Sequence, residues 1–176
     1  MLLLLTAALA APDGYSSLRS DQGVTLWEQK VDGGQPDYVI EVDLTRATVE
    51  NLVEPNGFDL WTHTVPDWWS RGDDKTFAMV NGAFFNTGAN PAAPAFGLRS
   101  DAHSYWHTGY GTDNEYQSEQ VSLQIRNSAD RATIKDRNAS DITDAGAAPE
   151  QLVALSPHAS KSPTSWVQRT FAGVKD

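Results

Sequence analysis

The run Thr76-Phe-Ala-Met-Val-Asn-Gly-Ala-Phe-Phe-Asn86 carries the most informative local pattern in this chain. Residues 76–80 are mostly apolar and predict a buried strand. Asn81 and Gly82 follow, a pair that readily takes positive φ and turns the chain. A buried strand that ends in a turn with a polar amide is a good support for a rigid site. An ordinary turn between two strands is the alternative that the same pattern allows.

Short segments with β-branched or alternating residues recur along the rest of the chain and predict strands. They are residues 23–30, 38–44, 48–53, 95–98, 121–126, 131–135, 152–155 and 166–174. We expect residues 48–53 to pair with residues 38–44, and residues 131–135 with residues 121–126. Residues 103–112 are rich in Gly and aromatic residues and predict a loop. The expected fold is therefore α+β, with a mixed, largely antiparallel β-sheet and a few short helices.

Residues 64–72 carry the best helix pattern. Pro66 falls in the first turn, where its missing N–H costs nothing, and Asp67 there is favourable to the helix dipole. We expect Gly72 to end the helix in the left-handed conformation.

The composition of the 176 residues limits the possible functions. A chain of this length can form one domain with a real core. Its formal net charge of −10 argues against nonspecific binding to nucleic acid and to an anionic membrane surface. A few well-placed Arg residues would still let an acidic protein bind a phosphate group. The absence of cysteine excludes disulfides, thiolate zinc sites and cysteine nucleophiles.

Residues 1–11 read MLLLLTAALAA, a pattern typical of the apolar core and cleavage site of a secretory signal peptide. The charged start of such a signal is missing, so we expect the signal to be truncated at its beginning. The protein is then exported (periplasmic, cell-surface or secreted), and residues 12–176 form the folded part. The run is too short to span a membrane, and an apolar N-terminal strand or helix is the alternative.

Two sets of side chains match metal ligands only in part. His103 and His107 have the spacing of two zinc ligands on a helix, but the Glu of H-E-x-x-H is absent. Residues 73–74 and 113–115 supply oxygen atoms of the kind that calcium prefers, without the spacing of a regular calcium loop. We therefore expect the two histidines to lie on the surface or to serve packing, and the acidic residues to be solvated. We expect the protein to bind neither a metal nor a cofactor.

Two arginines lie in contexts that suit an anion. Arg99 precedes a Ser-Asp pair, and Arg169 is followed by Thr170 inside a predicted strand. The planar guanidinium matches phosphate oxygens, and a neighbouring hydroxyl adds a donor. A surface arginine on a strand face is the alternative for each.

Four segments in this order resemble the phosphodiester glycosidase family, which includes the mannose-6-phosphate uncovering enzyme and many exported bacterial proteins. They are residues 64–72 (TVPDWWSRG), 77–86 (FAMVNGAFFN), 96–101 (FGLRSD) and 168–174 (QRTFAGV). Family members carry Asn-Gly-Gly/Asp-x-Phe after a strand and, later, Arg-Thr-x-x-Gly, which match residues 81–85 and 169–173. The resemblance covers most of residues 24–176.

The resemblance implies hydrolysis of the bond between a sugar anomeric carbon and a phosphodiester oxygen. A phosphate leaving group is already a stable anion, so it needs less protonation than the alkoxide of an ordinary glycoside. Arg169, assisted by Thr170, is expected to bind the phosphate, and Asn81 to hold a sugar hydroxyl or the attacking water. Asp101 is a candidate base or cation stabiliser. The residues expected to line the substrate are Phe85, Arg99 and Trp106.

The family pattern continues past the Arg-Thr strand to an Asp-Gly-Gly-Gly-Ser segment that lines the site, whereas this chain ends at Asp176. We therefore expect residues 12–176 to be the front portion of an incomplete domain, whose activity requires the remainder. The rival function is an exported carbohydrate-binding or cell-surface module without catalysis, since six Trp and five Tyr suit sugar stacking. A structural fragment without activity of its own is the third alternative.

Overall fold

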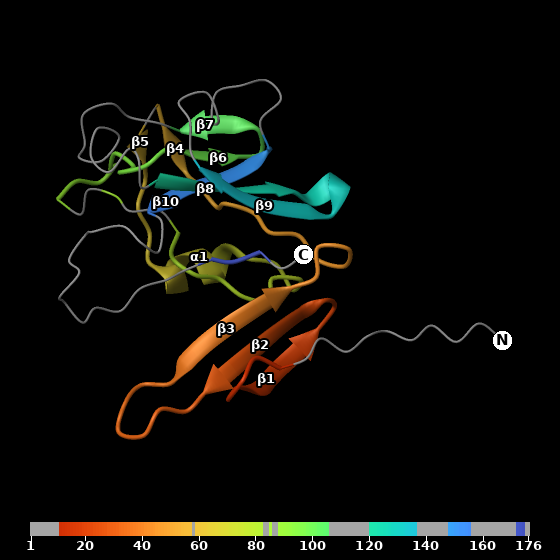
Figure 1. Cartoon of the computed structure of the whole chain (residues 1–176). Coiled ribbons are helices and arrows are strands. Elements are labelled where there is room, and N and C mark those ends of the chain that lie inside the picture. Colours follow the sequence, from red (N-terminus) through yellow and green to blue (C-terminus); the bar gives the residue numbers. More distant parts are fainter. Residues whose placement is uncertain are drawn as a thin grey trace. The chain divides into compact units, whose positions relative to one another are not determined.

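The computed structural model of the chain describes residues 11–57, 59–82, 85, 88–105, 120–136, 148–155 and 172–174 (Figure 1). The chain divides into two compact units, Met1–Ala47 (unit 1) and Thr48–Asp176 (unit 2). Within the described ranges, no helix is long and apolar enough to cross a membrane.

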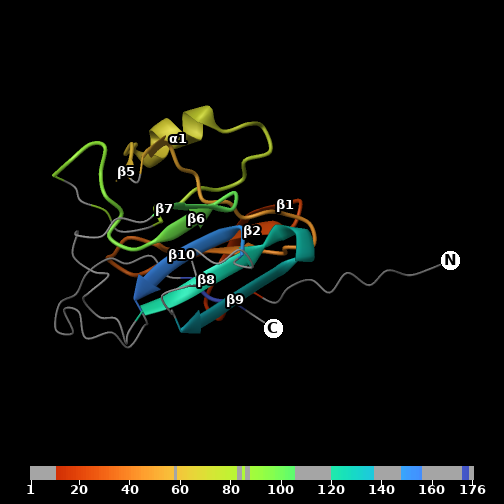
Figure 2. The ribbon, with the colours of Figure 1, turned by 90° about the horizontal axis from the view of Figure 1, so that it is seen from above.

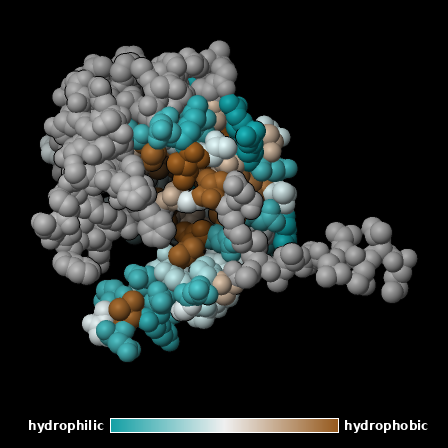
Figure 3. Space-filling model, in the orientation of Figure 1, coloured by the Kyte–Doolittle hydropathy of each residue, from teal (hydrophilic) through white to brown (hydrophobic). Residues whose placement is uncertain are grey.

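Unit 1 is an antiparallel meander of three strands in the order β1-β2-β3. The strands are β1 (Ser16–Asp21), β2 (Val24–Gln29) and β3 (Asp37–Val42). Gln22 and Gly23, with φ of 44° and 92°, form the two-residue turn between β1 and β2, as the right-handed twist of a hairpin favours. The loop between β2 and β3 is mostly hydrophilic (Figure 3). Residues 23–30 and 38–44 are thus confirmed as strands, with slightly different ends.

Trp27 and Val24 are the buried apolar side chains among the described residues of unit 1. Trp27 is 8% exposed, and its Nε1–H donates to the Glu41 carboxylate on β3 at 3.0 Å. Burial of the ring is therefore combined with a partner for its polar nitrogen, which stabilises the β2–β3 pairing.

Unit 2 is built on a five-stranded antiparallel sheet in the order β7-β6-β10-β8-β9 (Figure 2). Its strands are β7 (His103–Tyr105), β6 (Leu98–Ser100), β10 (Glu150–Leu155), β8 (Gln120–Arg126) and β9 (Arg131–Asp136). A two-stranded ladder of β4 (Pro55–Asn56) and β5 (Asp59–Leu60) and the 3-10 helix η3 (Asn127–Ala129) accompany it. The last described strand, β10, is the central strand, and Ala95, Phe96 and Val153 form its buried apolar cluster.

The helix α1 (Val65–Arg71) begins and ends with local signals. Thr64 is its N-cap: the Thr64 hydroxyl accepts from the Asp67 N–H at 3.2 Å, and the Asp67 carboxylate accepts from the Thr64 N–H at 3.2 Å. This reciprocal pair is a capping box, and Pro66 lies in the first turn as expected. The expectation for Gly72 is wrong, because its φ of −68° and ψ of 161° are extended, so the chain leaves the helix directly.

The predicted strand at residues 76–80 is wrong. None of the described sheets includes these residues; Val80 is 60% exposed, and the four before it are half-buried. Gly82 does not have the positive φ that the Asn-Gly pair predicts. An apolar run forms a strand only where a neighbouring strand is available for its backbone, and periodicity does not reveal that partner.

Two other strand expectations and one loop expectation need correction, and one further strand lies mostly outside the described residues. Residues 48–53 form no strand, because β3 pairs with β2 on one side and residues 48–53 are tied to unit 2 by side-chain bonds. In residues 95–98 only Leu98 is strand, and His103–Tyr105 is a strand rather than loop. The predicted strand at 166–174 lies outside the described residues, except 172–174, which have no regular structure.

The remaining strand predictions are confirmed. Residues 121–126 and 131–135 pair as β8 and β9, and residues 152–155 lie in β10. The described residues thus form an α+β fold dominated by antiparallel sheets with one short α-helix, as expected.

Candidate functional site

Two neighbouring rows of side chains cross all five strands of the larger sheet. In β7-β6-β10-β8-β9 order, the first row is Tyr105, Leu98, Leu152, Leu123 and Ile134. The second row is Ser104, Arg99, Gln151, Gln124 and Thr133. Successive residues of a strand point to opposite sides of a sheet, so one side carries the apolar row and the other the polar row. We call these sides the apolar face and the polar face.

The polar face is buried at its centre. Gln151 and Ser122 are 0% exposed, and Arg99 is 8% exposed. Ser122 Oγ donates to Gln151 Oε1 at 3.3 Å, and Gln151 Nε2 donates to the Ala148 carbonyl at 3.2 Å. Arg99 Nη1 donates to Ser104 Oγ at 3.2 Å, within the same row. Burial of polar groups is unfavourable unless they are hydrogen-bonded, so a sheet face of this composition is a specific feature.

A buried carboxylate, Glu150, organises the end of the sheet beside Arg99. Glu150 is 5% exposed, and its two oxygens accept from the backbone N–H groups of Asn51 at 2.8 Å and Asp101 at 2.6 Å. The Asn51 side chain donates to the carbonyls of Arg99 at 2.9 Å and Gln151 at 3.0 Å. Residues from three distant parts of the chain are thus held in one network, which fixes the backbone that carries Arg99.

Asp101 lies in the two-residue turn between β6 and β7. Asp101 and Ala102 have φ of 45° and 64°, a hairpin geometry that Asp tolerates. The Ala102 N–H donates to the Pro149 carbonyl at 3.0 Å, and His103 Nδ1–H donates to the Asp101 carbonyl at 2.9 Å. The Asp101 side chain is exposed. It therefore lacks the apolar surroundings that would help a carboxylate act as a base.

Asn81 and Phe85 are both exposed. A Cβ atom on the neighbouring Gly82 would lie 3.8 Å from Leu152 Cδ1, which places this segment over the apolar face. Phe85 is 42% exposed and forms an isolated bridge with Pro94. The structure therefore does not bring the segment of Asn81 to the sheet face that carries the Arg99 side chain.

Three predicted site residues, Trp106, Arg169 and Thr170, lie outside the described residues, as does His107. Across the parts of the chain that the structure describes, no group of three or more His, Asp or Glu side chains could hold a metal ion.

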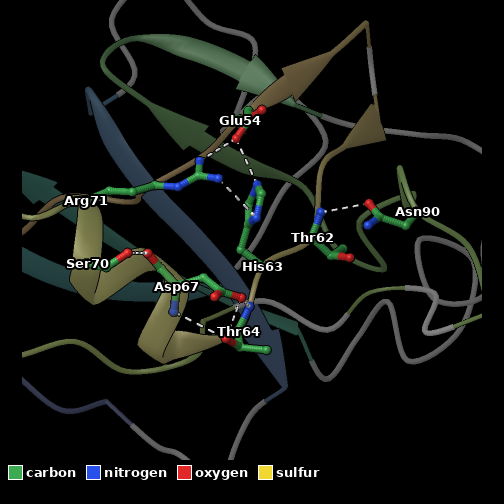
Figure 4. A network of polar contacts seen from close by, with 8 residues as sticks. All are labelled: Glu54, Thr62, His63, Thr64, Asp67, Ser70, Arg71 and Asn90. Carbon is green, nitrogen blue, oxygen red and sulfur yellow. Dashed lines mark hydrogen bonds and ion pairs between the residues drawn. The ribbon is translucent and has the colours of Figure 1, made fainter.

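A second polar cluster joins the residue before β4, the approach to α1 and the end of α1 (Figure 4). Glu54 Oε2 accepts from His63 Nε2–H at 2.8 Å and from Arg71 Nη1 at 2.5 Å. Arg71 Nη2 also faces His63 Nδ1 at 3.4 Å. The hydrogen bond from Arg71, and then that from His63, lowers the pKa of Glu54.

The Glu54 cluster is a structural tie rather than a catalytic dyad. Both ring nitrogens of His63 face partners, so neither faces a substrate. Trp68 packs edge-on against His63 at 5.1 Å, and the Arg71 guanidinium lies 5.1 Å from the centre of the same indole. Glu54 and Arg71 are about half exposed, which is typical of an ion pair of modest strength.

Sequence reasoning missed Glu150, Asn51 and the Glu54 cluster. None belongs to a motif, and their partners are separated by up to 100 residues. One signal was available for the polar face: Gln120, Ser122 and Gln124 alternate with apolar residues in the sequence.

Comparison with known proteins adds no relative: no family model, no curated protein and no solved structure matches this chain.

Proposed function

We propose that the chain belongs to a hydrolase that cleaves the bond between a sugar anomeric carbon and a phosphodiester, in the manner of a phosphodiester glycosidase. The observation that carries the proposal is the polar row of the five-stranded sheet, with the buried side chain of Arg99 on β6. The ordered resemblance of four segments to that family supports it independently of the geometry.

The side chains of the polar row suit a sugar phosphate. Amides and hydroxyls match the donors and acceptors of sugar hydroxyls, and a guanidinium matches phosphate oxygens with two parallel donors. Gln151 and Ser122 are fully buried and joined by a hydrogen bond, so they would support the half-buried members of the row, such as Gln124 and Thr133, rather than contact a ligand themselves.

The proposed roles follow the resemblance. Arg169 and Thr170 would bind the phosphate oxygens, and Arg99 would add a second guanidinium on the polar face. The resemblance assigns Asn81 to a sugar hydroxyl or the attacking water, but its segment lies over the apolar face, so we assign Asn81 no contact with a ligand on the polar row. Asp101 would stabilise the developing sugar cation. Phe85 and Trp106 would line the sugar. We also propose export of the protein, from the signal-like pattern of residues 1–11.

The direct test is hydrolysis of the methyl ester of glucose 1-phosphate by the full-length protein, followed by ³¹P NMR. Water adds at the anomeric carbon, so the products are glucose and methyl phosphate. We expect Arg169→Ala to abolish turnover, and Arg99→Lys, which keeps the charge but not the planar fork, to lower it about tenfold or more. Lys75→Gln removes an exposed charge elsewhere and serves as the control. Turnover by Arg169→Ala equal to that of the control would exclude the assigned role.

A non-catalytic carbohydrate-binding module is the second candidate, and two exposed indoles favour it. Trp61 is 41% exposed and Trp69 is 47% exposed, although most large aromatic rings are buried in folded proteins. Titration with neutral oligosaccharides, followed by tryptophan fluorescence, tests this function. Saturable binding that is lost in Trp61→Ala or Trp69→Ala, without hydrolysis, would favour the module over the enzyme.

A further inference from the structure

An exposed indole lies beside the Glu54 cluster of unit 2. The β4–β5 ladder pairs Pro55 with Leu60. The next pair beyond it joins Glu54 to Trp61, whose backbone N–H donates to the Glu54 carbonyl at 2.9 Å. Side chains directly opposite each other in an antiparallel pair lie on the same side, with Cβ atoms about 5 Å apart. His63, two residues after Trp61, contacts the Glu54 carboxylate from this same side.

The side chains at this surface keep polar atoms for further hydrogen bonds. His63 and Arg71 both bond to Oε2 of the Glu54 carboxylate. Among the described residues, Glu54 Oε1, Arg71 Nε and the Trp61 indole N–H have no hydrogen-bond partner. Glu54, Arg71 and Trp61 are 43%, 47% and 41% exposed, respectively. An acceptor, donors and an apolar ring are therefore accessible at one place on the surface.

The polar groups are positioned before any ligand binds (Figure 4). The Glu54 carboxylate joins Arg71, at the end of α1, to His63, before its start. Trp68 packs against both partners, because its ring lies 5.1 Å from that of His63 and 5.1 Å from the Arg71 guanidinium. Side chains that are already held in one arrangement lose less entropy when a ligand binds.

The neighbouring charges of Glu54 and Arg71 favour a ligand without charge. A charged ligand would meet a like charge as well as an opposite one, because the two side chains form an ion pair. A hydroxyl group both donates and accepts, so adjacent hydroxyls can donate to Glu54 Oε1 and accept from Arg71 Nε. The C–H face of a sugar ring is apolar and can cover an indole, whose apolar area is large.

We propose that Trp61, Glu54 and Arg71 form a binding surface for a neutral saccharide. Trp61 stacks against the apolar face of a sugar ring, and Glu54 and Arg71 bind two adjacent hydroxyls of the same saccharide. The surface uses no member of the polar row. It rests on the saccharide ligands of the proposed function, but not on hydrolysis.

Trp69 provides a matched control for Trp61. It is 47% exposed, so its replacement removes a similar indole from the surface. Trp68 and Arg71 are three residues apart in α1 and lie on one side of the helix, whereas Trp69 and Arg71 are two apart and do not face each other. We therefore expect binding to depend on Trp61 and not on Trp69.

The test is a titration of the full-length protein with neutral trisaccharides of glucose, mannose or galactose, followed by NMR of the backbone amides and indole N–H groups. We expect saturable shifts at the Trp61 indole with at least one trisaccharide. Trp61→Ala should weaken binding about tenfold or more, through loss of the apolar contact. Trp61→Phe keeps a planar apolar ring and should weaken binding less, and Trp69→Ala should leave it unchanged.

A charged ligand tests the role of the ion pair. The trisaccharide of galacturonic acid should bind more weakly than that of galactose, because its carboxylates approach Glu54. Equal affinity in Trp61→Ala and Trp69→Ala, tighter binding of the galacturonic acid trisaccharide, or no saturable binding would each overturn the proposal.

The outcome for this surface can be separated from that for the proposed enzyme. Saccharide binding at Trp61 without hydrolysis of the phosphodiester would support the surface and leave the enzyme unsupported. Hydrolysis that is unchanged in Trp61→Ala, in a protein that binds none of the neutral trisaccharides, would support the enzyme and exclude the surface.

Discussion

Unit 1 and unit 2 are both antiparallel sheets, but their strand pairs have different origins along the chain. In unit 1 each strand pairs with its neighbour in the sequence, through β1-β2-β3. In unit 2 the central strand β10 pairs with β8 and with β6, which lies about 50 residues earlier. Local pairing requires a turn and little loop closure, whereas the β10–β6 pair requires closure of a long loop.

This difference also separates the residues that hold each unit together. A turn at Gln22 and Gly23 sets the register in unit 1. In unit 2, Glu150 and Asn51 reach backbone groups that are about 50 to 100 residues away. A sheet whose strands are distant in sequence needs such side-chain ties, because no short turn fixes its register.

The largest expected effect comes from Glu150→Ala, which breaks the long-range ties of unit 2. The change leaves the buried N–H groups of Asn51 and Asp101 without acceptors and should cost about 3 kcal/mol of unfolding free energy. Urea denaturation measures this cost, and amide hydrogen exchange locates it. We expect exchange to accelerate in β6 and β10 while β2 and β3 remain protected.

Glu28→Ala in unit 1 is the matched control for Glu150→Ala. Glu28 also accepts a hydrogen bond, from the Tyr38 hydroxyl at 3.2 Å, but the pair is exposed. We expect a change below about 1 kcal/mol. Equal costs for the two substitutions would contradict the importance of the buried network.

The second prediction concerns the turn between β1 and β2 in unit 1. Gly23 has φ of 92°, and a Cβ atom there would lie 2.5 Å from Arg46 Cβ and 3.3 Å from the Asp43 carbonyl oxygen. Gly23→Ala should therefore cost about 2 kcal/mol, from backbone strain and from the clash. Gly33→Ala is the control, since φ is 72° but no atom lies within 4 Å, so only the strain of about 1 kcal/mol remains. Hydrogen exchange in β1 and β2 should report the difference, and similar protection in both variants would exclude the clash.

The third prediction concerns a local element within unit 2. Thr64→Ala removes the hydroxyl that caps α1 and should cost about 1 kcal/mol. Thr64→Ser keeps the hydroxyl and should be close to neutral. Because the hydrogen bonds from Thr64 lower the pKa of Asp67, Thr64→Ala should also raise that pKa, which NMR titration of the carboxyl carbon measures. An unchanged Asp67 titration in Thr64→Ala would show that the capping box does not persist in solution.

The smallest expected effect is the pH dependence of the Glu54 cluster. Its partners lower the pKa of Glu54 below the usual 4.5, so the folded chain holds this proton less tightly than the unfolded chain. The stabilisation is therefore present above pH 4.5 and is lost as the pH falls through the folded pKa. Glu54→Gln should flatten this part of the stability profile between neutral and acidic pH. A profile with the same slope in both proteins would indicate that the exposed pair contributes nothing.

Predictions from the sequence succeeded where neighbouring residues decide the structure. The start of α1 with Pro66 and Asp67 in its first turn, the hairpin of β8 and β9, and β2 and β3 all follow from patterns within a few residues. They failed at residues 48–53 and 76–80, whose apolar character is compatible with a strand but which have no described strand as a neighbour. The predicted roles of Trp106, Arg169 and Thr170 stay predictions.

By itself, the sequence determined the class of fold, the start of α1, and a polar and an apolar side for β8. The alternation of Gln120, Ser122 and Gln124 with apolar residues was enough for that. Only the tertiary structure decided that β10 lies between β6 and β8, and that Arg99 and Gln151 extend the polar row. It also decided that this row is buried at its centre and that Glu150 ties it to Asn51. The physical reason is that strand order and burial depend on contacts between residues far apart in the chain, whereas periodicity reports only on near neighbours.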